Sequence, residues 1–255
     1  MLNTARERAA RGAKRHNRPM ANSDTPTPEA PQTVRTSFGE QLNDLRVDLI
    51  TLAGLTGEAV RGATQCIIDK NIGGADNIIK NDGRIDELKE TTELKIYEIF
   101  ATQQPMAGDL RVLITVLRIL QEIQLSADLA VSIAKTARRL FPGELSPRFR
   151  RIIGLMGSQS VVQLEVAMDA FSDSNAEVAG ALPDMDNVMD DLQKDLFRQI
   201  FSEPAVAGED NPEQNLQFAV QLALLGRYYE RIADHTVLMG AWTRFMITGE
   251  FPSRR

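Results

Sequence analysis

Apolar residues recur at every third or fourth position through most of the chain after residue 37, which is the spacing of one face of an α-helix. The pattern stops at short segments rich in glycine, proline or asparagine, such as residues 71–74 and 141–147, which favour helix ends and turns. No stretch alternates apolar and polar residues in the manner of a β-strand. The sequence therefore predicts an all-α protein of six long antiparallel helices, over about residues 38–67, 75–102, 105–139, 147–175, 183–200 and 213–247.

Individual residues predict where three of these helices begin. Thr36 or Ser37 is placed as the N-cap of the first helix, with Glu40 positioned for a capping box. Ser146 is placed to cap the fourth helix. Pro183 is placed to open the fifth, since proline suits a first turn and not a helix interior. In the sixth helix we expect one apolar stripe, formed by Leu216, Val220, Leu224, Tyr228, Ile232 and Val237.

The six helices are predicted to be two copies of a three-helix unit. The second and the fifth helix each contain Asp-x-x-x-Asp followed two residues later by leucine, and the third and the sixth each carry one further aspartate. These aspartates are Asp82, Asp86 and Asp128 in the first half and Asp186, Asp190 and Asp234 in the second. Asp86 and Asp128 are 42 positions apart, and Asp190 and Asp234 are 44. We therefore expect two pseudo-symmetric three-helix bundles, over residues 34–142 and 143–255.

The charge of the chain is unevenly distributed. The net charge is −6, yet the first twenty residues carry six basic residues and one acid. Residues 1–33 are also rich in proline and threonine without helical periodicity, so we interpret them as a disordered basic tail. A further hypothesis is that translation begins at Val34 through a non-ATG start. The acidic remainder argues against nucleic-acid binding, while a single cysteine and the absence of a membrane-spanning apolar run favour a cytoplasmic protein.

Carboxylates on neighbouring helices are the candidate functional residues. A helix places Glu230 and Asp234 on one face, and the duplication places Asp186 and Asp190 on the partner helix. Carboxylates held together need solvent, protonation or a cation, and all-oxygen ligation suits Mg, Mn or Fe. The alternative is that these residues form solvated faces of amphipathic helices, since single acidic pairs at this spacing arise by chance in a chain with 35 acidic residues.

The motifs of common enzyme classes are missing from the sequence. There is no P-loop and no Gly-x-Ser-x-Gly, and Ile232 stands where a Glu-x-x-His di-iron motif ending at His235 would need glutamate. His235 is interpreted either as a ligand or as a structural histidine near the helix surface, and Arg227 and Arg231 are placed to neutralise Glu230. A metal-dependent hydrolase and a purely structural bundle are the alternatives to a regulatory role.

Residues 227–235 read Arg-Tyr-Tyr-Glu-Arg-Ile-Ala-Asp-His, and residues 104–111 read Gln-Pro-Met-Ala-Gly-Asp-Leu-Arg. Together with the repeated Asp-x-x-x-Asp, they resemble the Glu-Arg-x-x-Asp-His and Gln-Pro-x-Ala-x-Asp-Leu-Arg segments of the PhoU family of bacterial phosphate-transport regulators. The resemblance covers about residues 35–249. One departure is Gln124-Leu-Ser-Ala-Asp128, where the family usually has Glu-Arg-x-x-Asp, so an amide replaces a carboxylate.

The resemblance implies tandem three-helix repeats with surface sites for divalent or ferric ions. The stronger site is expected at Asp186, Asp190, Glu230 and Asp234, and the weaker one at Asp82, Asp86 and Asp128. It implies no catalysis. Such a protein would be an adaptor between the ATPase subunit of the phosphate ABC importer and a phosphate-sensing histidine kinase, restraining uptake and the phosphate-starvation response. A homodimer is expected, without nucleic acid, and with membrane association only through partners.

Overall fold

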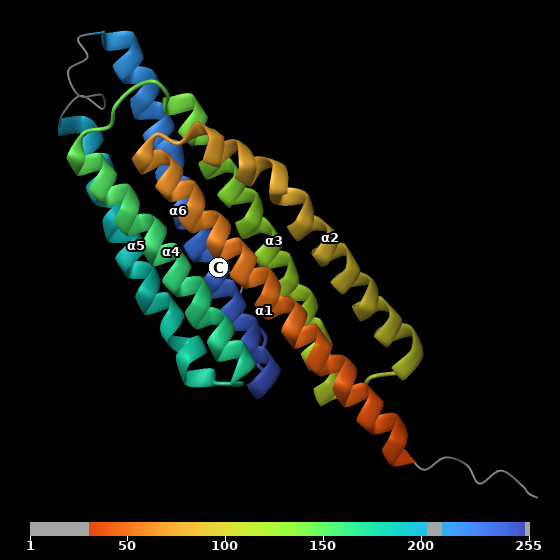
Figure 1. Ribbon diagram of the computed structural model, residues 1–255. Coiled ribbons are helices and arrows are strands. Elements are labelled where there is room, and N and C mark those ends of the chain that lie inside the picture. Colours follow the sequence, from red (N-terminus) through yellow and green to blue (C-terminus); the bar gives the residue numbers. More distant parts are fainter. Residues whose placement is uncertain (1–30, 203–210, 253–255) are drawn as a thin grey trace, which may run out of the picture.

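The computed structural model of the protein describes residues 31–202 and 211–252, and these ranges contain six helices and no β-strand. The helices are α1 (Pro31–Asp69), α2 (Ile72–Gln103), α3 (Gly108–Leu140), α4 (Pro147–Ser172), α5 (Ala176–Ser202) and α6 (Pro212–Thr248). They lie side by side along one long axis (Figure 1). The predicted all-α fold with six long helices is confirmed.

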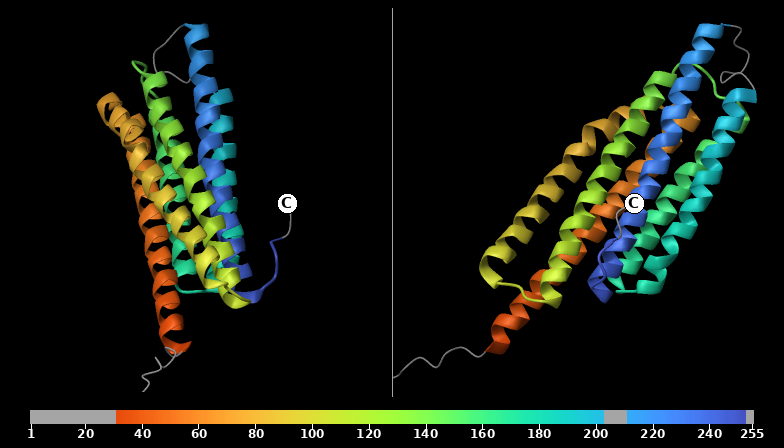
Figure 2. Two further views of the ribbon diagram at one scale, coloured as in Figure 1. Left: turned by 90° about the vertical axis from the view of Figure 1, so that its right-hand side faces the viewer. Right: turned by 180° about the vertical axis from the view of Figure 1, so that it is seen from behind.

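The helices are arranged as two three-helix bundles in contact. Among the six described helices, α2 contacts only α1 and α3, and α5 contacts only α4 and α6, so these two helices flank the molecule on opposite sides (Figures 1 and 2). The bundles pack together through α3 against α6 and through α1 against α4. The order of the helices is thus the same in both halves, as the duplication predicted.

The hydrophobic core is shared between the two bundles. One cluster of buried side chains joins Ile133 of α3 to Phe149 of α4 and Leu225 of α6. A second cluster, further along the axis, joins Leu49 of α1 to Met239 of α6. Each cluster draws on both repeats, so burial of the core depends on their association.

Asparagine side chains cap the N-termini of three of the helices. The side-chain oxygen of Asn71 accepts a hydrogen bond from the backbone N–H of the third helical residue of α2, at 2.9 Å. Asn175 accepts two such bonds at the start of α5, and Asn211 accepts two at the start of α6. These bonds satisfy N–H groups that have no partner inside a helix, which is why the chain turns at these residues.

Two predicted helix starts are wrong. Helix α1 begins at Pro31, so Thr36 and Ser37 lie inside it and not at its N-cap; the rest of the predicted tail, residues 1–30, lies outside the described residues. Helix α5 begins at Ala176, so Pro183 lies within it. Asn175 caps the helix eight residues before Pro183, and the buried side chains of Ala179 and Leu182 hold this segment in the helix although an interior proline costs about 3 kcal/mol.

The predicted apolar stripe of α6 is only partly buried. Leu216, Val220 and Leu224 are 65%, 49% and 40% exposed, while Ile232 is fully buried. The core side of this part of the helix is formed instead by Phe218, Leu222, Leu225 and Tyr229. Residues spaced strictly four apart turn by about 40° at each step, so such a series winds from the surface to the core.

Candidate functional site

The structure brings three of the second-half carboxylates together at the α5–α6 contact. Asp190 of α5 and Glu230 and Asp234 of α6 are all half-buried. Burial raises the pKa of Asp234, and the charges of Glu230 and Asp190 raise it further, while Arg227 and His235 partly oppose this. Asp186 is half-buried one turn before Asp190.

Glu230 is already held by two neighbours. Arg227 forms an ion pair with its Oε2, and Nε2 of Gln193 on α5 donates a hydrogen bond to the same atom at 2.5 Å. The expectation that arginine neutralises this glutamate is therefore confirmed for Arg227. No ion pair of Arg231 is found among the described residues.

The first-half carboxylates form a comparable group between α2 and α3. Burial raises the pKa of Asp82, followed by the charges of Asp86 and Asp128, with Lys135 opposing. The pKa of Asp128 is raised in the same way, by burial and then by Asp86. Nε2 of Gln124 donates to Oδ1 of Asp86 at 2.7 Å, so in both repeats a glutamine amide bonds a carboxylate of the other helix.

The oxygen-bearing side chains of these clusters are suited to a metal ion, but their positions do not form a metal site. The carboxylates repel one another, and the buried atoms Oδ1 of Asp82 and Oε1 of Gln124 accept no hydrogen bond from the described residues. A hard cation would relieve both conditions. Within residues 31–202 and 211–252, however, no three Asp, Glu, His or Cys side chains converge as a metal site.

His235 is buried and joins the two repeats. Its Nδ1 lies 2.7 Å from Oε2 of Glu122 on α3, and His235 and Glu122 are only 7% and 8% exposed. The expectation of a histidine near the helix surface is thus wrong. Glu122 was not identified from the sequence, although it lies on the apolar face of α3 with Ile119, Ile123 and Ser126, all buried. A buried carboxylate needs a polar partner. An acidic residue within an apolar stripe is therefore the sequence signal that could have identified Glu122.

The segment 227–235 contacts three helices at once. Glu230 bonds Gln193 of α5, and His235 bonds Glu122 of α3. The hydroxyl of Tyr229, fully buried, is 2.8 Å from Oγ1 of Thr64 on α1. The segment therefore holds α6 against α5 of its own repeat and against α1 and α3 of the other repeat. These contacts give a structural role to the motif from which the metal site was predicted.

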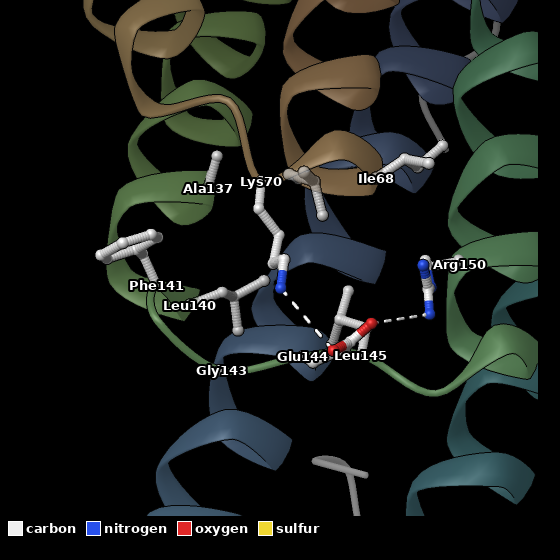
Figure 3. A pocket seen from close by; sticks show the side chains of 10 residues that line it. Ile68, Lys70, Ala137, Leu140, Phe141, Gly143, Glu144, Leu145 and Arg150 are labelled. Carbon is white, nitrogen blue, oxygen red and sulfur yellow. Dashed lines mark hydrogen bonds and ion pairs between the residues drawn. The ribbon is translucent and has the colours of Figure 1, made fainter.

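A pocket at the end of the bundle is very small. It lies between the α1–α2 turn and the α3–α4 loop (Figure 3), and its cavity of about 10 Å³ holds about one water molecule. Its basic residues, Lys70 and Arg150, both pair with Glu144, at 3.7 and 3.3 Å. Glu144 thus engages both basic residues, while Nε of Arg150 is buried without a hydrogen-bond partner among the described residues.

The fold and these contacts define a class: a duplicated three-helix-bundle protein whose repeats share a core and carry acidic faces. The PhoU domain family model matches this chain twice, over residues 49–137 and 153–243, one match in each repeat. The chain belongs to the PhoU domain family. No helix among the described residues is long and apolar enough to span a membrane.

Relatives in other organisms match the chain over most of its length. The phosphate-specific transport system accessory protein PhoU homolog 1 of Mycobacterium tuberculosis is 30% identical over 221 residues, which is 86% of this chain and 97% of that protein. The PhoU homolog of Clostridium acetobutylicum is 28% identical over 217 residues, covering 85% and 96%.

The fold is that of solved PhoU structures. The crystal structure of PhoU from Pseudomonas aeruginosa aligns with 84% of this chain and all of that one, with a TM-score of 0.75 and 24% identity. PhoU from Streptococcus pneumoniae, the phosphate transport system regulatory protein, aligns with 85% at the same TM-score and 22% identity.

Proposed function

We propose that this protein is a regulatory accessory component of a phosphate-specific transport system and a negative regulator of the phosphate-starvation response. The observation that carries the proposal is family membership over both repeats, with relatives named as accessory proteins of that system aligned over nearly their whole length. A regulator that acts by contact needs surfaces and not a catalytic centre, so the proposal assigns no catalysis.

We further propose that it is an adaptor between the ATPase subunit of the phosphate ABC importer and a phosphate-sensing histidine kinase. An adaptor needs two docking surfaces. Each repeat exposes apolar side chains at the start of its third helix: Leu110, 37% exposed, on α3 and Leu216, 65% exposed, on α6. Leu110 precedes Asp128 by 18 positions, and Leu216 precedes Asp234 by the same number, so the two leucines are equivalent in the duplication. Exposed apolar patches of this kind are typical of interaction sites.

The docking part of the proposal is tested with the purified importer ATPase. Leu216→Asp places a charge in the exposed surface of α6 and is expected to weaken binding at least about tenfold, since burial of a leucine contributes roughly 1.5–3 kcal/mol. Leu155→Asp is the matched control, because Leu155 on α4 is 46% exposed. Equal affinity of the two variants would remove α6 as the docking surface, and no binding by the wild-type protein would contradict the adaptor role.

Three further properties belong to the proposal. We propose that the protein is a cytoplasmic homodimer. Sedimentation of the purified chain measures whether it is a monomer or a dimer.

We also propose that the two clusters of carboxylates, one in each repeat, bind hard metal ions such as Mg, Mn or Fe. The types of donor and the mutual repulsion at Asp234 and Asp82 support this, although the side chains would have to shift to converge. A phosphatase activity lost in Glu230→Ala would favour the hydrolase alternative instead.

A further inference from the structure

Basic residues gather at the end of the bundle where the α3–α4 loop lies (Figure 3). Residues 138–151 carry five arginines and one acid, a net charge of +4 within a chain whose net charge is −6. We call this end of the molecule the basic end. It consists of Lys70, Arg138, Arg139, Phe141, Arg148, Arg150 and Arg151.

Three of these arginines have no acidic partner. Arg139, Arg148 and Arg151 are exposed, and within residues 31–202 and 211–252 none of them forms an ion pair. The other three basic side chains share two acids, Asp76 and Glu144. Three positive charges therefore remain without a neutralising neighbour from the described part of the chain, and they attract negatively charged surfaces.

The charges of α4 oppose its helix dipole. The helix begins with three arginines and has no acid in its first turn, where the backbone N–H groups already carry partial positive charge. It ends with Asp169 and Asp173 and has no basic residue in its last turn. From residue 152 to residue 193 the chain contains eight acids and no lysine or arginine. Helix stability does not account for this arrangement, which makes the two ends of α4 opposite in charge.

An exposed aromatic side chain lies among the arginines. Phe141 directly follows the last residue of α3 and is 51% exposed, at the edge of the loop in Figure 3. Basic residues beside an exposed aromatic ring are typical of surfaces that bind anionic membranes, because the charges attract the headgroups and the ring enters the interface. The pocket at this end measures only about 10 Å³, so it offers no cavity to the side chain of a protein partner. A bilayer surface requires no such cavity.

We propose that the basic end docks on the surface of a bilayer that contains anionic phospholipids. The exposed arginines lie against the lipid phosphates, and Phe141 enters the interface. The acids at the far end of α4 are repelled by the same surface, so the long axis of the bundle points away from the bilayer. This inference goes beyond the proposed function and differs from the expectation that membrane association occurs only through partners, since lipid binding requires neither the importer nor the kinase.

The test is flotation of the purified full-length protein with two kinds of vesicle. One kind is phosphatidylcholine alone, and the other is phosphatidylcholine and phosphatidylglycerol in a ratio of two to one. Binding to the second kind only is expected, and it should weaken as salt is raised. One basic residue near an anionic surface contributes about fivefold to binding, so Arg148→Glu/Arg151→Glu should weaken it at least about tenfold. Since acids suit the start of a helix, the Tm of this variant should be no lower than that of the wild type.

Arg231→Glu/Arg244→Glu is the matched control. It changes the net charge by the same amount, but both residues are exposed in the second half of α6, away from the basic end, so it should bind vesicles as the wild type does. Phe141→Ala leaves the charge unchanged and should weaken binding severalfold, because burial of an aromatic ring in the interface is lost.

The inference is overturned if the protein binds neither kind of vesicle or binds both equally. It is also overturned if Arg148→Glu/Arg151→Glu binds as the wild type, which would assign binding to the basic residues of the first twenty positions, or if the control loses as much affinity. Absence of vesicle binding together with weaker binding of Arg148→Glu/Arg151→Glu to the importer ATPase would assign the basic end to a protein partner instead. Vesicle binding involves no transport partner, so its failure is distinct from a failure of the proposed function.

Discussion

The buried bond between His235 of α6 and Glu122 of α3 joins the two repeats, and replacing its partners singly and together measures how much the repeats depend on it. Their side chains are 9% and 11% exposed, and the nitrogen–oxygen distance is 2.7 Å. His235→Leu leaves the Glu122 carboxyl buried without its partner, a change that costs about 3–5 kcal/mol. Glu122→Leu leaves the Nδ1 of His235 buried without its partner, which costs about 1–3 kcal/mol.

The double variant Glu122→Leu/His235→Leu removes both polar groups and is expected to lie within about 1 kcal/mol of the wild type, because replacing a buried pair by apolar side chains is often neutral. Urea unfolding followed by circular dichroism gives the free energies of unfolding. The sum of the single losses should exceed the loss in the double variant by at least about 2 kcal/mol. In thermal unfolding, a loss of about 3 kcal/mol in His235→Leu lowers the Tm by roughly 6–12 °C.

Simple additivity of the two single substitutions would refute this reasoning, since it would mean that the two side chains do not depend on each other. Glu122→Gln provides a conservative comparison. Its amide oxygen still accepts the hydrogen bond from Nδ1, so it should lose less stability than His235→Leu.

Three further outcomes are expected. Elemental analysis should show that Glu230→Ala or Asp190→Ala lowers bound metal more than Asp128→Ala; equal losses would refute the asymmetry between the repeats. Because the pKa of Asp234 is raised in the folded protein, its contribution to the free energy of unfolding falls as pH rises through that raised pKa. In urea unfolding, Asp234→Asn should therefore be more stable than the wild type at pH 7. It should lose this advantage near pH 3, about where the carboxyl is neutral in both the folded and the unfolded state. Gly240→Ala would bring a Cβ within 2.7 Å of a backbone carbonyl of α5, and should cost about 1–3 kcal/mol in the same assay; an unchanged free energy of unfolding would show that α5 yields freely there.

Local sequence patterns predicted most of the fold. The apolar spacing located six helices, and the repeated aspartates located the duplication, because both are properties of single helices or of their order along the chain. Pro183 was misplaced because the cap at Asn175 and the burial of Ala179 and Leu182 outweigh the cost of a proline inside the helix, about 3 kcal/mol. The stripe of α6 was misjudged because a series at strict four-residue spacing rotates away from the core.

The candidate site was only partly predictable. Asp190, Glu230 and Asp234 do come together, because the duplication placed α5 beside α6. Glu122 and its bond to His235 were missed, because they depend on which face of α3 meets α6, and helical spacing within one segment does not determine that. The same limit applies to Gln193 and Gln124, whose amides bond carboxylates across helices.

Deletion of the gene in the source organism tests the central claim most directly. Expression of a phosphate-starvation reporter is measured in cells grown with abundant phosphate, with and without a plasmid copy of the wild-type chain. A negative regulator predicts that the reporter is constitutively active in the deletion strain and is repressed again by the plasmid copy. Unchanged, phosphate-repressed expression in the deletion strain would contradict the proposed function.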